Sequence, residues 1–311
     1  MTVYLIRRLM GLIFVVLAVT CLTFIIGHAA PGDPIQTIMG FRHDPVEYHR
    51  LRHLYGLDRP LLVQLGDYLW HIVRWGDFGL SFRYDGRPVM SLLLNALPVT
   101  LTIGLSALAL ACAIGVPIGI WAAVRQNKAF DRVSMTLVLL LYSVPSFVLI
   151  PILLSIDIWL DTHGYPSLPV ANWGTVQQAI LPILVLAAGS AAYIARLTRT
   201  TMVGILREDF VRTARAKGLP RALVVGKHAL RPALLPVITF LGPAIGLLVT
   251  STFVVENIFN LPGVGFTAVT SINARDYPVV QGTTIIVAVG VAVMNLIADL
   301  LYRVLDPRIQ E

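Results

Sequence analysis

The residues best suited to chemistry in this sequence are cations, concentrated in one polar stretch between two long apolar runs. The stretch, residues 196–231, holds nine of the 24 lysines and arginines and only two acids, Glu208 and Asp209. The nine cations are Arg196, Arg199, Arg207, Arg212, Arg215, Lys217, Arg221, Lys227 and Arg231. Guanidinium and ammonium groups pair with acidic surfaces of a partner or with lipid headgroups. The pattern therefore predicts a recognition surface.

A short helix is predicted at the centre of this stretch, from Glu208 to Lys217. Its acids lie at the start and its cations at the end, the order that complements a helix dipole. Gly218 suits a left-handed C-cap, and Pro220 stops any continuation. Small side chains would let another backbone come close, which suggests docking into a partner's groove. These are Thr213, Ala214, Ala216 and Gly218. The alternative is a basic loop that only sets orientation and touches headgroups.

Catalytic and nucleotide-binding motifs do not occur. There is no G-x-x-x-x-G-K-[ST] loop, no H-E-x-x-H and no G-x-S-x-G, so we expect no ATP binding and no enzymatic activity in this chain. Residues 263–268 mimic a dinucleotide fingerprint but follow no predicted strand. Asp299 is isolated within an apolar run, and His28 and Asp157 lie near run boundaries, where anchoring is the simpler role. An ion-driven carrier would ordinarily need carboxylates at mid-depth, so this scarcity favours an external energy source.

Composition places the chain in a membrane. Its 311 residues are 56% hydrophobic and 13% charged, about half the charge of a soluble domain. The net charge of +7 does not indicate nucleic-acid binding, because no basic stripe with interleaved aromatics occurs. Cys21 and Cys112 fall inside apolar runs and are interpreted as small buried hydrophobes.

Six apolar segments are long enough to span a bilayer as helices. We place them at residues 9–29, 99–124, 133–156, 176–195, 234–255 and 282–302. The first could be a cleavable signal peptide, but its apolar core is long for one, and an uncleaved span is favoured. Prolines interrupt four of the other spans. Each proline either marks a position beside a transport pathway or is a packing kink. The pairs Gly115–Gly119 and Gly242–Gly246 would allow close helix crossing.

The distribution of cations predicts the orientation. Sixteen of the 24 lysines and arginines fall on the side that holds both termini, and eight on the other. The excess places both termini in the cytoplasm. An even number of spans agrees, because it puts the two termini on the same side. The region 31–97 is then extracytoplasmic, with helical stretches at 46–55 and 61–73. It is either a small cap without a ligand role or a region that contacts substrate.

A family resemblance enters at residues 207–236, REDFVRTARAKGLPRALVVGKHALRPALLP. This loop resembles the cytoplasmic "EAA" motif of binding-protein-dependent ABC transporter permeases, in particular the B-type subunit of the dipeptide/oligopeptide/nickel permease family. Of the generic Glu-Ala-Ala and Gly positions, Ala214 and Gly218 match, whereas Arg212 and Thr213 depart as the peptide branch characteristically does. Further similar blocks cover almost the whole chain in order. They are residues 4–9, 31–34, 57–60, 76–81, 256–259, 262–265, 276–278 and 305–308.

The resemblance implies an all-α membrane protein of six transmembrane helices with the type I ABC importer permease fold. It divides the chain into a first helix (1–30), an extracytoplasmic insertion (31–97), a permease core (94–303, with a coupling loop at 196–233) and a cytoplasmic tail (304–311). The location would be the bacterial inner membrane. The implied partners are a homologous second permease, two cytoplasmic ATPase subunits that bind ATP and Mg, and an extracytoplasmic solute-binding protein.

The resemblance also implies two sites, with no cofactor or metal in this chain. ATPase coupling is assigned to Glu208, Asp209, Arg212, Thr213, Ala214, Arg215, Lys217 and Gly218. An outer gate or a seat for the binding protein is assigned to Glu256, Asn257, Phe259, Pro262, Gly263 and Gly265, with a stable turn as the alternative. The implied cargo is di- or oligopeptides, with nickel or metal chelates and glutathione as alternatives. A stand-alone carrier or channel, and a scaffold without a pathway, are more distant alternatives.

Overall fold

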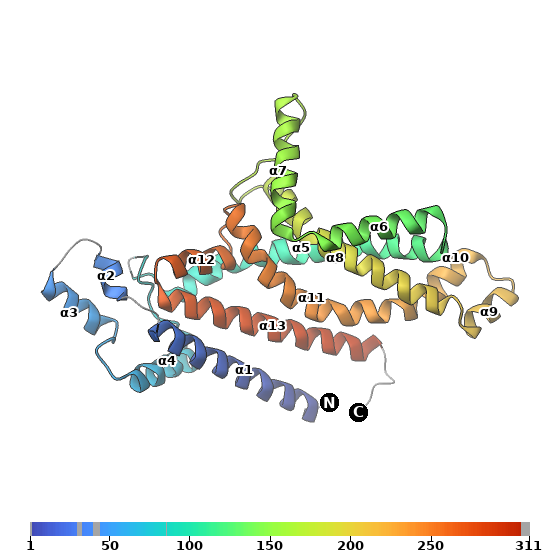
Figure 1. Ribbon diagram of the computed structural model, residues 1–311. Coiled ribbons are helices and arrows are strands. Elements are labelled where there is room, and N and C mark those ends of the chain that lie inside the picture. The colour runs from blue at the N-terminus through green and yellow to red at the C-terminus, as the bar shows by residue number, and fades with distance from the viewer. Residues whose placement is uncertain (1, 30–32, 40–43, 85, 306–311) are drawn as a thin grey trace. The chain divides into compact units, whose positions relative to one another are not determined.

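The computed structural model describes residues 2–29, 33–39, 44–84 and 86–305, and these residues are mainly helical (Figure 1). The described part contains one isolated backbone bridge, between Leu80 and Pro88. The chain forms two compact units. The first comprises Met1–Thr100 and Leu261–Ala292, and the second comprises Leu101–Asn260 and Val293–Glu311. The proposed cytoplasmic tail lies almost entirely outside the described residues.

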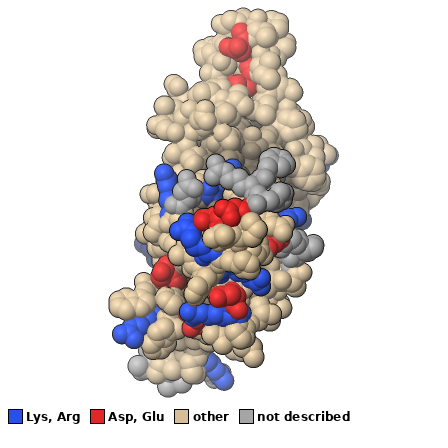
Figure 2. All heavy atoms as spheres, turned by 90° about the vertical axis from the view of Figure 1, so that its left-hand side faces the viewer, with Lys and Arg blue, Asp and Glu red and all other residues tan. Residues whose placement is uncertain are grey.

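The first unit joins the start of the chain to a late segment. It contains α1 (Thr2–Ala29), α2 (Pro34–Met39), α3 (Pro45–Leu54), α4 (Leu61–Trp75), the start of α5 (Val89–Val124), α12 (Val264–Asn273) and much of α13 (Tyr277–Leu305). The helices predicted at 46–55 and 61–73 are thus confirmed as α3 and α4. Acidic and basic side chains are interspersed over the face that lies at the left of Figure 1, as Figure 2 shows.

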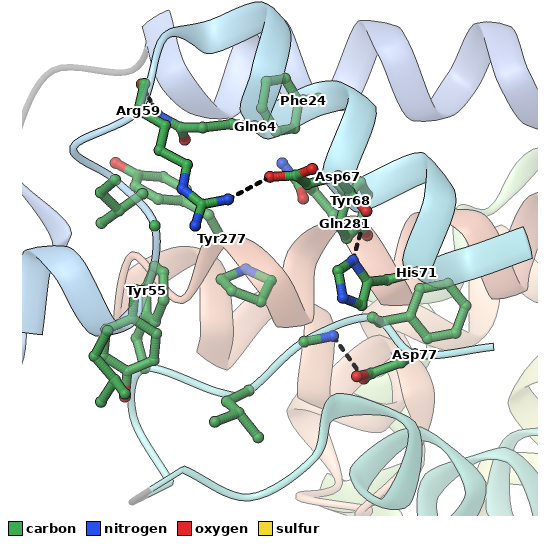
Figure 3. Close-up of a pocket in the computed structure, with 18 of the residues that line it drawn as sticks. Phe24, Tyr55, Arg59, Gln64, Asp67, Tyr68, His71, Asp77, Tyr277 and Gln281 are labelled. Atoms are coloured by element: carbon green, nitrogen blue, oxygen red, sulfur yellow. Dashed lines mark hydrogen bonds and ion pairs between the residues drawn. The ribbon is translucent and has the colours of Figure 1, made fainter. Parts of the chain in front are cut away.

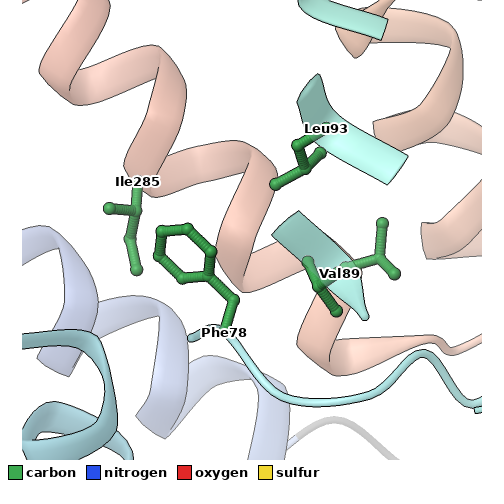
Figure 4. Close-up of a cluster of buried hydrophobic side chains, with 5 residues drawn as sticks. Phe78, Val89, Leu93 and Ile285 are labelled. Atoms are coloured by element: carbon green, nitrogen blue, oxygen red, sulfur yellow. The ribbon is translucent and has the colours of Figure 1, made fainter. Parts of the chain in front are cut away.

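The core of this unit packs α13 against the start of α5 and the segment that precedes it. Phe78, Val89, Leu93 and Ile285 form a buried apolar cluster (Figure 4). Gly282 allows the close approach, because a Cβ there would lie 2.7 Å from Cγ1 of Val89.

A buried carboxylate fixes the loop that leads into α5. Asp276 is fully buried and accepts hydrogen bonds from the Ser81 hydroxyl at 2.5 Å and from the backbone N–H groups of Phe82 and Arg83 at 3.0 and 3.2 Å. Because these donors satisfy the buried charge, the loop is held firmly to the segment before α13.

The second unit is organised around α8 (Val176–Ile205), which packs against α6 (Ala129–Ser143), α7 (Ser146–Thr162) and α11 (Leu230–Ile258). Its N-terminus has a capping box, in which Thr175 and Gln178 satisfy each other's backbone N–H groups. A Cβ on Gly115 or Gly119 of α5 would lie 2.7 or 2.6 Å from the carbonyl oxygens of Ala191 and Ala195 in α8. This confirms the close crossing predicted at Gly115–Gly119, since no side chain fits there.

Five helical segments of the described chain are long and apolar enough to cross a membrane. They are Ile6–Ala29, Val89–Val124, Val176–Ile205, Arg221–Gly242 and Tyr277–Ile297. The third predicted span, at 133–156, is not one continuous helix. It is the pair α6 and α7, which meet at an angle of 107° and diverge in Figure 1. Pro145 explains the break, because it lacks an N–H and forces Val144 into an extended conformation (φ −88°, ψ 117°).

Candidate functional site

The predicted coupling helix exists as α9 (Asp209–Ala216), which follows the end of α8. Glu208 occupies the N-cap without a side-chain hydrogen bond, and Lys217 is the C-cap. In Figure 1 this helix lies with α10 (Arg221–Leu223) at one end of α8. The chain continues into a π-helix, η1 (Val224–Ala229), and then into α11. π-helical turns occur frequently at functional sites.

An apolar face holds α9 to its own chain. Val211 and Ala214 are buried with Val224 of η1, and Leu206 and Leu219 pack on this cluster. Ala214 was predicted to permit close approach by a partner, but its side chain is buried within this cluster. Its small size lets α9 lie close to η1, and its part in ATPase coupling stays a prediction.

The opposite face of α9 is exposed and polar. Its exposed residues are Glu208, Asp209, Arg212, Thr213, Arg215, Lys217 and Gly218. An ion pair on this face joins Arg212 to Asp209 at 3.2 Å, and both side chains are largely solvated, so it contributes little stability. The charges are therefore available to a partner.

Phe210 was not singled out in the sequence, although it lies on the same helix. Its ring is 49% exposed among charged neighbours. An exposed aromatic side chain on a polar helix face is typical of an interface anchor. The available signal was its position beside Glu208 and Asp209, where an apolar residue interrupts a polar run.

Gly218 has a positive φ of 75°, as the predicted left-handed cap requires. Its N–H donates to the carbonyl of Arg215, and the N–H of Leu219 donates to that of Ala214. A Cβ on Gly218 would meet nothing within 4 Å. The glycine is therefore required by backbone conformation and not by crowding within this chain.

Several of the nine cations are structural. Arg199 lies within α8, because this helix continues ten residues beyond the predicted span, to Ile205. Its guanidinium forms a two-pronged ion pair with Asp131 of α6, at 2.6 and 2.7 Å. Asp131 is 2% exposed and also accepts from the N–H of Asn127. The pair thus fixes the turn between α5 and α6 against α8.

Two other cations bind the end of α5. Arg221 donates to the carbonyl of Val124 at 3.3 Å, and Arg207 donates to the Gln126 side chain at 3.3 Å. Arg221 thereby satisfies a carbonyl at the C-terminus of α5. The segments that flank α9 are in this way joined to α5, α6 and α8.

The second predicted site, residues 256–265, is mostly buried. Glu256 and Phe259 are 0 and 1% exposed, Gly263 and Gly265 are buried, and Pro262 is exposed. The Asn257 amide donates to the carbonyl of Phe253 within α11. This burial favours a packed structural turn, and the role of an outer gate stays a prediction.

The start of α12 shows how this turn is held. The N–H of Val264 donates to the Thr100 hydroxyl at 2.8 Å, where both groups are buried. Among the described residues, no group of three His, Cys, Asp or Glu side chains is arranged to hold a metal ion. The side chain of Asp299 lies outside the described part.

Two protein-family models match this chain, and together they include residues of both units. The family described as "Binding-protein-dependent transport system inner membrane component" matches residues 115–311, and the N-terminal part of such membrane components matches residues 1–104. The chain belongs to this family. It is accordingly a multi-pass inner-membrane permease subunit of an ABC importer.

Relatives in this family match over the full length. The dipeptide transport system permease protein DppB of Bacillus subtilis is 39% identical over 307 residues, covering 99% of this chain and 97% of the relative. The glutathione transport system permease protein GsiC of Salmonella choleraesuis is 40% identical over 311 residues, covering 99 and 98%. A putative peptide transport system permease of Brucella abortus is 38% identical over 314 residues, covering 100 and 99%.

A solved structure supports the fold. The permease in an inward-facing structure of the MetNI methionine ABC transporter has a TM-score of 0.57 and 19% identity, covering 70% of this chain and 97% of that chain. The expected type I importer permease fold is thereby confirmed. At this identity the similarity concerns the fold alone.

Proposed function

We propose that this permease carries di- or oligopeptides inward as one half of a translocation pathway. The observation that carries the proposal is full-length similarity, at 39%, to a permease named for dipeptides. Glutathione is itself a peptide, so the 40% identity to a glutathione permease supports the same cargo class. The second candidate cargo is nickel or another metal chelate, which the family resemblance implies.

The proposed complex contains a homologous second permease, two cytoplasmic ATPases and an extracytoplasmic solute-binding protein. This chain performs no catalysis in it, and ATP and Mg are held by the ATPases. The cation excess on the 196–231 side supports an orientation with α9 and both termini in the cytoplasm. The α9 helix is then on the side where ATPases assemble.

In the proposed mechanism the exposed face of α9 inserts into a cleft on one ATPase. Phe210 fills an apolar depression, while Arg212, Arg215 and Lys217 pair with acidic groups at its rim. Movement of the ATPase then displaces α9, and the cluster around Val211 and Ala214 passes the displacement to α8 and η1. Coupling requires that the docked helix make different contacts in the two states of the ATPase.

Reconstitution of the complete importer in vesicles tests the function. The vesicles contain ATP on the side of the ATPases, in the lumen, and the binding protein is added outside. We expect uptake of a labelled dipeptide and ATP hydrolysis that the peptide stimulates. Uptake of nickel chelates without peptide uptake would replace the peptide assignment. Peptide uptake by this chain unaccompanied would contradict the assembly.

A further inference from the structure

A cavity of about 490 Å³ lies in the first unit, large enough for a small organic ligand. Side chains from the end of α1, from α4, from the start of α13 and from the loops at 53–59 and 77–82 converge on it (Figure 3). All of these segments belong to the same compact unit. In the proposed orientation the cavity is on the extracytoplasmic side, where a binding protein releases its cargo.

Two tyrosines that line the cavity have unpaired hydroxyl groups. The hydroxyls of Tyr68 and Tyr277 are buried without a hydrogen-bond partner among the described residues. Burial raises the pKa of Tyr68, so its phenol stays protonated and can donate as well as accept. Leaving a buried hydroxyl unpaired costs free energy, so each hydroxyl needs a partner from outside the chain, and a polar ligand group can serve as that partner.

The remaining lining combines amide groups with aromatic walls. Gln281 is 5% exposed and lines the cavity. Gln64 of α4 also lines it, but its amide is already paired: its oxygen lies 3.1 Å from Nε2 of His28, and its nitrogen donates to the carbonyl of Arg59. Phe24 and Phe78 supply apolar surface. The Gln281 amide and the two phenols can donate and accept hydrogen bonds, so they suit a ligand that carries its own amide, such as a peptide bond.

The charged side chains that line the cavity indicate the charge of the ligand group that would bind there. One guanidinium, that of Arg59, is present with two carboxylates, those of Asp67 and Asp77, among the described lining residues. Three imidazoles also line the cavity, and each already contacts an oxygen of the chain: His28, His53 and His71. Arg59 is already paired with Asp67 at 2.8 Å. Asp77 accepts from the N–H of Gly79, and its carboxylate forms no ion pair among the described residues. Because Arg59 is already paired and the Asp77 carboxylate is not, the charges of the lining disfavour a phosphate headgroup and favour an ammonium group.

We propose that this cavity binds the amino-terminal end of a short peptide. The α-ammonium group faces Asp77, the first peptide bond pairs with the hydroxyls of Tyr68 and Tyr277, and the first side chain lies against the aromatic wall. The proposal rests on the proposed function, because it treats the bound peptide as cargo arriving from the binding protein.

Direct binding to the complete transporter tests the proposal. The permeases and ATPases are placed in lipid nanodiscs without the binding protein, and alanyl-phenylalanine is titrated by calorimetry beside its N-acetylated form. We expect the acetylated peptide to bind at least tenfold more weakly, because it has no ammonium group. Losing one hydrogen bond costs roughly 1 kcal/mol, about fivefold in affinity. The double variant Tyr68→Phe/Tyr277→Phe should therefore weaken binding more than tenfold, and Asp77→Asn about tenfold.

Thermal unfolding separates a binding role from a structural one. Removing unpaired hydroxyls should leave the melting temperature of the double variant unchanged or raise it. The matched control is Tyr165→Phe, at an exposed tyrosine outside the cavity.

Four outcomes would each overturn the cavity assignment. They are equal binding of both peptides, unchanged binding in the variants, displacement by lipid but not by peptide, and no binding. If these results occur while the reconstituted importer still takes up peptide, the proposed function stands. Peptide binding here without peptide uptake would refute that function instead.

Discussion

The α9 segment and residues 256–265 were both predicted as sites from family motifs, yet their surroundings differ. The exposed face of α9 is charged and solvated, and its buried face is limited to Val211 and Ala214. In the second segment Glu256, Phe259, Gly263 and Gly265 are buried. Similar motif evidence thus falls on an exposed charged face in one place and on a packed turn in another. Exposure of the side chains distinguishes the two.

The largest effect is expected where the second segment is buried. Phe259→Ala removes a ring that is 1% exposed, and such truncations cost about 3–5 kcal/mol. We expect a lowered melting temperature of the purified permease complex and reduced amounts in the membrane. Ile258→Ala, at a 48% exposed neighbour, is the control and should change little. Normal stability with lost response to the binding protein would instead indicate a gate.

The next effect is expected on the exposed face of α9. Phe210→Ala should leave the melting temperature nearly unchanged but reduce peptide-stimulated ATP hydrolysis by about tenfold, because interface aromatics carry a large share of binding energy. Phe147→Ala, at an exposed phenylalanine of α7, is the matched control. Unaltered coupling in Phe210→Ala would remove the ring from the proposed interface.

Substitutions at Gly218 distinguish a requirement for its backbone conformation from a requirement for empty space at its Cα. Its φ of 75° disfavours a β-branched residue, whereas asparagine tolerates this region. Gly218→Val should destabilise the cap by roughly 1–2 kcal/mol and lower transport, and Gly218→Asn should retain most of both. If asparagine fails as completely as valine while the complex inserts normally, close approach by the ATPase must be the reason.

The smallest effect is expected at Pro262, the exposed member of the second segment. Surface substitutions are usually within about 0.5 kcal/mol, so Pro262→Ala should leave the melting temperature unchanged. The affinity of the permease complex for the binding protein should also be unchanged if this segment is a structural turn. A several-fold loss of that affinity, measured by biolayer interferometry, would restore the predicted seat.

The sequence by itself determined the membrane class, the approximate positions of most apolar spans, the short helix of α9 and the glycine crossing at Gly115–Gly119. These features depend on apolar length, on capping residues and on the absence of a side chain, which are local properties. Helix ends were less predictable: α8 continues to Ile205, and within this extension Arg199 pairs with Asp131, 68 positions earlier in the chain.

Only the tertiary structure decided which side chains face outward and which distant groups meet. Pro145 signalled a kink, but the angle of 107° depends on how α6 and α7 pack on α8. The burial of Ala214 depends on Val224, and the cavity brings Tyr68 together with Tyr277. No local pattern encodes such pairs, because their free energy arises when segments far apart in the chain pack together.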